Sequence, residues 1–285
     1  MFKNLGKAFS RKPDGPENTG NVQKEINRVP GAEASATLDP WWWLVAAVAA
    51  LIALLAIISP DPYWNIIVFV RKGIGITVLL TAVSFVFIIL VGLIGGLGRI
   101  AKNPVIHFIS TLYVEIIRGI PLLVQLIWWY FAAPSAIKSI GRALHVSALA
   151  DYQANPIFLA ILGLVICYGA YMTEIFRAGI QSIPKGQMEA ARSLGMTYLQ
   201  SMRYIIIPQA MRVVLPPVGN EFIMLIKDTS LVSVVAVADL TRQGREYMAS
   251  HFNPLETWTL IALLYLILTL FSARLIAWFE NRRKY

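Results

Sequence analysis

The feature that most constrains this chain is a series of apolar runs long enough to cross a lipid bilayer. A hydrocarbon core of about 30 Å needs about 20 helical residues at 1.5 Å each. Uncharged runs near this length occur at residues 41–58, 74–97, 119–137, 156–173 and 257–273. Three tryptophans open the first run, as expected for an interfacial belt. The sequence therefore predicts an all-α integral membrane protein.

A sixth segment, residues 204–226, is less apolar because it contains Arg212, Glu221 and three prolines. We count it as a span because the loops on its two sides must lie on opposite faces of the membrane. Across the chain 57% of residues are apolar and 14% are charged, whereas soluble domains have about 25% charged residues. We predict about six transmembrane helices.

The ends of the chain are polar. Residues 1–40 contain too little apolar surface to fold alone and are too polar for a signal peptide. We predict a cytoplasmic N-terminal tail at 1–40, an additional helix at 41–59, a main transmembrane domain at 70–280 and a basic tail at 281–285. With both termini inside, cytoplasmic segments hold roughly twice as many Lys and Arg as external ones.

Charge and cysteine content exclude other classes of protein. The net charge of +9 is spread over short tracts between apolar runs, so no nucleic-acid surface is predicted. Cys167 is the single cysteine, which rules out an intrachain disulfide, and its apolar surroundings indicate a small buried side chain. The histidines lie far apart in the sequence from one another and from Cys167, so no metal site is predicted.

The loop between the fourth and fifth spans, residues 182–200, has the sequence SIPKGQMEAARSLGMTYLQ. Ser182 and Pro184 are suited to start a helix, and Gly195 is suited to the left-handed position that ends one. Thr197 can cap a second helix that continues into the membrane. The small side chains of Ala190 and Ala191 would let another surface approach closely.

This loop resembles the EAA loop of ABC importer permeases. In that family the loop is a coupling helix that docks on a cytoplasmic ATPase. The resemblance extends to Ile205 and Pro208, with Ile207 where the family usually has Leu. It implies an ATPase-coupling role for Gly186, Glu189, Ala190, Ala191 and Gly195.

Further segments resemble the polar amino acid permeases of this class, which take up histidine, glutamine, glutamate, arginine and similar solutes. They are YVEIIRGIPLLVQL (113–126), EIFRAGIQSIPKGQMEAARSLGM (174–196), PPVGNEFI (216–223) and KDTSLVSVVAVADL (227–240). The resemblance spans roughly residues 73–280 and implies a type I ABC importer permease fold in the bacterial plasma (inner) membrane. It also implies three partners: an ABC ATPase dimer, a second permease copy or paralogue, and an extracytoplasmic amino-acid-binding protein.

No G-x-x-x-x-G-K-[ST] phosphate loop occurs in the sequence. We therefore predict that the chain is not an enzyme, that it holds no cofactor of its own, and that ATP and magnesium bind to the partner ATPase. The glycines of GLIGGLGRI (92–100) lack the following Lys and Ser or Thr, so we interpret them as sites of close helix packing.

The fifth span contains Pro216 and Pro217 about 12 Å beyond Pro208, close to the middle of the membrane. Prolines there predict a broken helix of the kind at which transporters often bind solute. Asn220 and Glu221 follow directly. Either they line the translocation pathway, with Glu221 meeting a solute ammonium group, or the break is a kink satisfied by contacts between helices.

Three other polar clusters have two interpretations each. Glu174 and Arg177 have the spacing of a helical ion pair, with solute contact as the alternative. Glu115 and Arg118 share that spacing before Gly119, and we interpret them as an interfacial elbow. The outer end of the fifth span either forms a gate or caps the next helix; its residues are Lys227, Asp228, Thr229 and Ser230.

The segment at 228–254 is too short and interrupted to cross and predicts a short helix at the outer face or a partly re-entrant one. Three alternatives to the amino acid importer stay open. One is an ABC permease for another small solute such as methionine. Another is an ion-coupled secondary transporter. The last is a membrane enzyme, for which the sequence shows no convergent acid, base or metal ligands. The identity of the amino acid and the choice between homodimer and heterodimer are not given by the sequence.

Overall fold

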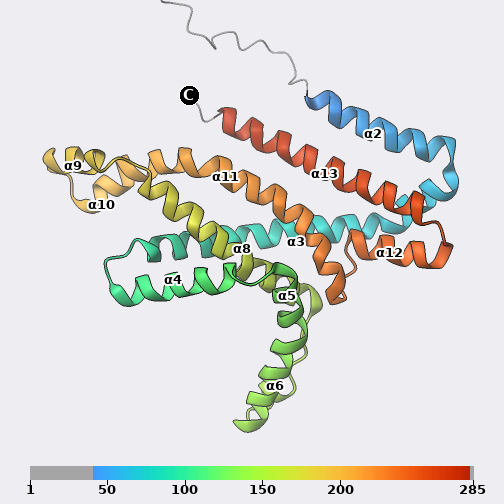
Figure 1. The fold of residues 1–285 in the computed structure, drawn as a ribbon, viewed down its shortest axis with the longest axis horizontal. Coiled ribbons are helices and arrows are strands. Elements are labelled where there is room, and N and C mark those ends of the chain that lie inside the picture. Colours follow the sequence, from blue (N-terminus) through green and yellow to red (C-terminus); the bar gives the residue numbers. More distant parts are fainter. Residues whose placement is uncertain (1–40, 283–285) are drawn as a thin grey trace, which may run out of the picture. The chain divides into compact units, whose positions relative to one another are not determined.

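The computed structural model describes residues 41–282, and in this part of the chain the secondary structure is entirely helical (Figure 1). The predicted N-terminal tail at 1–40 and the end of the basic tail lie outside the described residues. The elements are α2 (Trp41–Ile58), α3 (Pro60–Arg99), α4 (Pro104–Arg118), α5 (Leu122–Ile127), η1 (Trp128–Ala132), α6 (Ala133–Ala143), α7 (Ser147–Ala150), α8 (Pro156–Gln181), α9 (Lys185–Ser193), α10 (Tyr198–Ser201), η2 (Met202–Ile206), α11 (Ile207–Asp228), η3 (Thr229–Val235), α12 (Leu240–His251) and α13 (Pro254–Arg282).

Within residues 41–282, four helices are long and apolar enough to cross a membrane: α2, α3, α8 and α13. The pair formed by α4 and the segment 122–143 makes a fifth if it is taken as one bent span. Helix α11 has 22 residues, or about 33 Å, which is long enough. Its charged residues make it less apolar than α2, α3, α8 and α13. Its role as the sixth membrane-spanning helix therefore stays a prediction.

The chain turns sharply between α4 and α5, and α4 forms an angle of 102° with the segment 122–143 that α5 begins. Helix α4 runs beside α3, and α5, η1 and α6 lead away from it (Figure 1). Pro121 precedes α5 and lacks an N–H, and the amide of Gln125 donates to the carbonyl oxygens of Ile117 and Ile120, both at 2.8 Å. The expected elbow beside Gly119 is confirmed, but the predicted span at 119–137 starts too early, because the helix begins only after Pro121.

Helices α3 and α8 form the most extensive contact of the bundle, and glycines make it possible. A Cβ atom on Gly92 would overlap the side chain of Met172, and one on Gly96 would lie 2.8 Å from the Cβ of Phe176. Glycines of this kind let two helix backbones approach closely. The predicted packing role of the GLIGGLGRI glycines is confirmed.

The substitution Gly92→Leu is expected to destabilise the protein because the new side chain must displace Met172, which is fully buried. Overpacking of this kind costs about 1–3 kcal/mol. Gly75→Leu on the same helix is the matched control, because nothing lies within 4 Å of a Cβ placed there. Thermal unfolding of the purified chain in detergent should show a lower midpoint for Gly92→Leu alone. Equal midpoints for the two variants would contradict the packing role of Gly92.

The segment that follows α11 forms two short elements, η3 and α12, at the end of the bundle opposite α9 and α10 (Figure 1). Helix α12 has 12 residues, about 18 Å, which is too short to cross a bilayer. Its first turn is tied to α3: Gln243 accepts from the backbone N–H of Gly73 at 2.8 Å, and Thr77 accepts from that of Leu240 at 3.2 Å. The predicted short helix is therefore present and firmly attached.

Candidate functional site

The loop that joins α8 to α11 folds into two short helices, α9 and α10. Helix α9 begins at Lys185 after Pro184, and no side chain caps it. The prediction that Ser182 starts this helix is wrong: Ser182 ends α8, and its hydroxyl donates to the carbonyl oxygen of Gly179 at 2.8 Å. The last carbonyl oxygens of a helix have no partner within the helix. Because one of them accepts from this hydroxyl at the end of α8, Ser182 does not cap α9.

The turn between α9 and α10 matches the prediction. Gly195 has φ +81°, a conformation that residues with a Cβ rarely adopt. The backbone N–H of Met196 donates a hydrogen bond to the carbonyl oxygen of Ala191 at 3.2 Å. Thr197 then forms a capping box with Gln200, in which each side chain accepts from the backbone N–H of the other residue. These contacts fix the direction in which the chain enters η2 and α11.

An exposed apolar surface, which we name the coupling-loop patch, covers this loop. Its members are Leu194, Tyr198 and Leu199, which are 83%, 56% and 76% exposed. Glu189, Ala190 and Gly186 are also exposed, and a Cβ at Gly186 would meet open space. Ala191 is 4% exposed and packs inside the protein. The expectation that Ala191 leaves room for another surface is therefore wrong, and Ala190 alone of the two alanines faces outward.

Helix α11 is continuous from Ile207 to Asp228, with Pro216 and Pro217 in its interior. The predicted break at these prolines is therefore wrong. The irregular turn lies earlier, at the π-helical segment η2, where the N–H of Ile207 bonds to the carbonyl oxygen of Met202. Pro208 directly follows, and it lacks the N–H that an α-helical turn would use. The wider π-helical turn of η2 accommodates the missing hydrogen bond at the start of α11.

A small cavity opens between α8 and α11, and we name it the acidic cavity. Its volume is about 180 Å³, the liquid volume of about six water molecules. Glu221 and Asp228 supply its charge, and the Tyr168 hydroxyl donates to the Asp228 carboxylate at 2.6 Å. Its lining residues are Leu122, Cys167, Tyr168, Tyr171, Glu221, Met224 and Asp228. The cavity thus presents two carboxylates to a space suited to a small solute.

A second cavity, which we name the arginine cavity, shares Tyr171 with the first. Its volume is about 310 Å³, and its lining includes Glu115, Arg118 and Tyr171. The Arg118 guanidinium lies over the Tyr171 ring, 5.1 Å from its centroid, a cation–π geometry. Tyr171 and Tyr168 are adjacent, with ring centroids 6.2 Å apart. Tyr171 therefore lies between the arginine cavity, which holds Arg118 and Glu115, and the acidic cavity, which holds Glu221 and Asp228.

The residues predicted for the pathway do not all come together. Glu221 and Asp228 line the acidic cavity, whereas Pro216, Pro217 and Asn220 are exposed elsewhere on α11. A continuous helix turns neighbouring residues about 100° apart, so Asn220 and Glu221 cannot share one face.

The capping alternative for the end of α11 is wrong for Asp228, which makes no side-chain cap bond and instead accepts from Tyr168. Thr229 is buried, and its hydroxyl donates to the carbonyl oxygen of Ile226 at 2.6 Å. Lys227 is exposed and Ser230 is half-buried, and neither lines the acidic cavity. Of these four residues, Asp228 alone contributes to that cavity.

The predicted ion pair between Glu174 and Arg177 is present. It belongs to a larger cluster, because Arg99 on α3 lies 3.5 Å from Glu174 and 3.8 Å from Glu115 on α4. The Arg99 side chain is largely buried, with 16% exposed, so this cluster ties three helices together near one end of the bundle. These contacts support the structural interpretation of the pair.

Sequence reasoning missed Tyr168 and Tyr171 and the bridging role of Arg99. A signal for the tyrosines was available: they lie three residues apart in an otherwise apolar run and so share one helix face. Buried tyrosine hydroxyls usually find a partner, and Tyr168 finds Asp228. Nothing in the sequence could show that Arg99 meets Glu174, since 75 positions separate them.

Comparisons with known proteins cover most of the chain. Residues 88–285 match the family described as binding-protein-dependent transport system inner membrane component. The glutamine transport system permease protein GlnP of Escherichia coli K12 is 36% identical over 221 residues, 78% of this chain and 95% of that protein. The arginine transport system permease protein ArgU of Corynebacterium glutamicum is 35% identical over 266 residues, 86% of this chain and 83% of that protein.

Solved structures agree with these matches. A chain from a crystal structure of an amino acid ABC transporter with histidines superposes with a TM-score of 0.67 at 36% identity, covering 80% of this chain and 97% of that one. A chain of the MetNI methionine ABC transporter in an inward-facing conformation gives 0.58 at 21% identity, covering 76% and 95%. The second likeness, at its low identity, supports the fold alone.

Proposed function

This chain belongs to the family of binding-protein-dependent transport system inner membrane components, and we infer that it is a permease subunit of an ATP-driven importer for polar amino acids. The observation that carries this function is the identity of 36% with a glutamine permease across 78% of the chain. The structure has the type I ABC importer permease fold. An ion-coupled carrier or a membrane enzyme would belong to another family, and a methionine importer is supported by the fold alone.

The coupling-loop patch is the surface on which an ATPase subunit would dock. Three large apolar side chains stand exposed on a loop whose backbone is fixed by Gly195 and by the Thr197 capping box. Exposed apolar groups on an ordered element mark an interaction site. Because the sequence lacks a phosphate-binding loop, ATP and magnesium would be held by that partner.

The acidic and arginine cavities together suit the two charges of an amino acid. The ammonium group would lie in the acidic cavity against Glu221 and Asp228, and the carboxylate would face Arg118 across Tyr171. Charge-assisted hydrogen bonds of this kind are about twice as strong as neutral ones. The solute can shift the conformational equilibrium only by binding one state better than the other.

The topology we propose has α9 and both termini in the cytoplasm and α12 at the outer face. It follows the distribution of Lys and Arg in the loops. One chain supplies half of the pathway, so a second permease, identical or paralogous, would complete it. An extracytoplasmic amino-acid-binding protein would deliver the solute at the α12 end.

The test is uptake by the assembled importer. The chain is reconstituted in liposomes with the ATPase and the binding protein encoded beside it, and labelled amino acids are offered. We expect uptake of the amino acid that the binding protein prefers, dependent on ATP and insensitive to a protonophore. Uptake by the chain alone that follows a proton or sodium gradient would overturn the proposal.

A further inference from the structure

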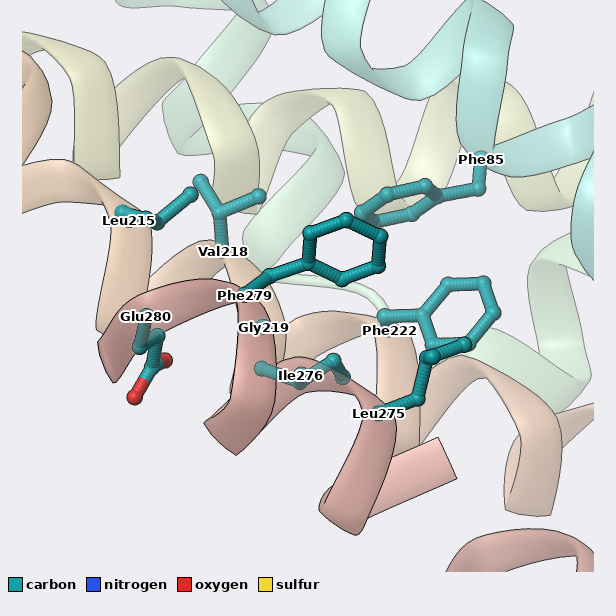
Figure 2. Close-up of a pocket in the computed structure, with 9 residues that line it drawn as sticks. All are labelled: Phe85, Leu215, Val218, Gly219, Phe222, Leu275, Ile276, Phe279 and Glu280. Atoms are coloured by element: carbon teal, nitrogen blue, oxygen red, sulfur yellow. The ribbon is translucent and has the colours of Figure 1, made fainter. Parts of the chain in front are cut away.

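Two faces of helix α11 are covered by other helices of the chain. On one of them Val214 packs against Gly179 of α8, because a Cβ atom on that glycine would overlap Val214. On the other, Gly219 lies against α13 and Phe222 against α3 (Figure 2). A third face is exposed, and we name it the polar face of α11. Its members are Arg212, Val213, Pro216, Pro217, Asn220, Met224 and Lys227.

These exposed residues form one continuous surface. At about 100° per residue, the seven positions fall within an arc of about 140° around the helix. Asn220 lies near the centre of that arc. The exposed surface therefore has a polar amide at its middle, and a charged side chain toward each end of the helix, Arg212 and Lys227.

The polar face lies at the depth of the membrane interior. Helix α11 is about 33 Å long, and the proposed topology makes it the sixth span. Along its axis, Asn220 is about 4 Å and Arg212 about 8 Å from the middle of the helix. With α11 centred in the membrane, both lie within the hydrocarbon core, which extends about 15 Å to each side. Polar groups at this depth are costly in lipid and face protein or water instead.

The backbone of the polar face also needs hydrogen-bond partners. Pro216 and Pro217 have no N–H, so the carbonyl oxygens four residues earlier lose their α-helical hydrogen bonds. Those carbonyl oxygens belong to Arg212 and Val213, and the Val213 residue is 48% exposed. Unpaired carbonyl oxygens are not tolerated where they face lipid. The polar face thus carries free acceptors and the donors of a guanidinium at one depth.

This combination of groups is self-complementary. Two identical helices related by a two-fold axis along the membrane normal bring the same groups together at the same depth. The Arg212 guanidinium of one copy, which has five N–H donors, can then meet the free carbonyl oxygens of the other. The Asn220 amide both donates and accepts, so two such amides satisfy each other. Amide side chains of this kind join transmembrane helices.

We propose that the polar face of α11 binds the same face of a second copy of this chain, with the Asn220 amides of the two copies hydrogen-bonded to each other. The contact presupposes the proposed importer function, in which two permeases form one pathway. It makes those two permeases identical.

Disulfide cross-linking of the full-length chain in liposomes tests the contact. Asn220→Cys places a thiol at its centre, and we expect copper phenanthroline to convert most of this variant to covalent dimers. The native Cys167 is buried and should form none. Leu266→Cys is the control and should stay monomeric, because Leu266 is exposed near the middle of another helix, α13. Monomers from Asn220→Cys, or equal dimer yields from the two variants, would overturn the proposal.

A charge exchange separates a lost contact from a misfolded chain. Asn220→Asp alone and Asn220→Lys alone place like charges against each other and should weaken dimerisation by about tenfold or more. Co-expression of the two variants with different affinity tags should restore the dimer, because opposite charges then meet. A mixed pair that does not recover would contradict the contact between the two copies of residue 220.

Other occupants of the polar face give different results. A water-filled passage would let a membrane-impermeant maleimide react rapidly with Asn220→Cys, without dimers. A paralogous permease would purify with the tagged chain in place of a second copy. Either result would exclude the homodimer contact and leave ATP-dependent uptake by the assembled importer unaffected. Absence of that uptake with dimers still formed would count against the proposed function alone.

Discussion

Replacing Leu194 with Asp is expected to abolish ATP-driven uptake by the assembled importer. Leu194 is 83% exposed on the turn after α9 and is the most exposed member of the coupling-loop patch. If an ATPase covers it, the substitution removes about 2 kcal/mol of apolar burial and leaves a carboxylate without a partner. The first effect alone weakens docking about 30-fold. The measurement is co-purification of the ATPase with the tagged permease, followed by uptake in liposomes.

Phe252→Asp is the control for this experiment. Phe252 is 88% exposed, so the change in exposed apolar area is comparable, but it lies after α12 at the opposite end of the bundle. Its φ of +56° is a conformation that Asp tolerates well, so no folding defect is expected. ATPase binding should be normal for Phe252→Asp. If Leu194→Asp also retained the ATPase, docking through the coupling-loop patch would be ruled out.

Glu221→Gln is expected to lower uptake about tenfold or more while leaving docking of the ATPase intact. The amide keeps the shape of the side chain but removes the charge that would meet the solute ammonium group in the acidic cavity. Hydrogen bonds to charged groups contribute about 1.5–3 kcal/mol, which corresponds to roughly 10- to 100-fold in affinity. Uptake and substrate-stimulated ATP hydrolysis should both decrease, and basal hydrolysis should not.

Glu246→Gln serves as the control for this prediction. Glu246 pairs with Arg242 on α12, where the pair is exposed and contributes little. Tyr168→Phe extends the test, because it removes the hydrogen bond to Asp228 without changing the charge of the cavity. Its effect on uptake should be smaller than that of Glu221→Gln. Wild-type uptake and substrate-stimulated hydrolysis by Glu221→Gln would remove Glu221 from the pathway.

The local features of the coupling loop followed from the sequence because they depend on neighbouring residues. Gly195 adopts a positive φ, Thr197 caps α10, and the helix boundaries of α2 agree with its apolar run. The Ser182 prediction failed for a local reason as well: two helix ends compete for one hydroxyl, and spacing does not show which end wins.

The fold class was also accessible, because bilayer thickness and hydrophobicity leave few solutions for runs of this length. The family relationship followed instead from the resemblance of the loop at 182–200 and its flanking segments to known permeases. The break predicted at Pro216 was wrong because a proline removes one backbone N–H without necessarily ending a helix, and a membrane-spanning helix can continue through it. Here the π-helical turn of η2 precedes Pro208, and α11 continues through the later prolines without a break.

The sequence by itself determined the membrane fold, the position of the coupling loop and the presence of Glu221 and Asp228 in or beside one helix. The tertiary structure decided which of these residues face one another. It placed Tyr168 against Asp228 across 60 positions and Arg118 over Tyr171, and it separated Asn220 from Glu221. The physical reason is that hydrophobicity is a property of a segment, whereas a cavity is made by the contacts and crossing angles of several helices.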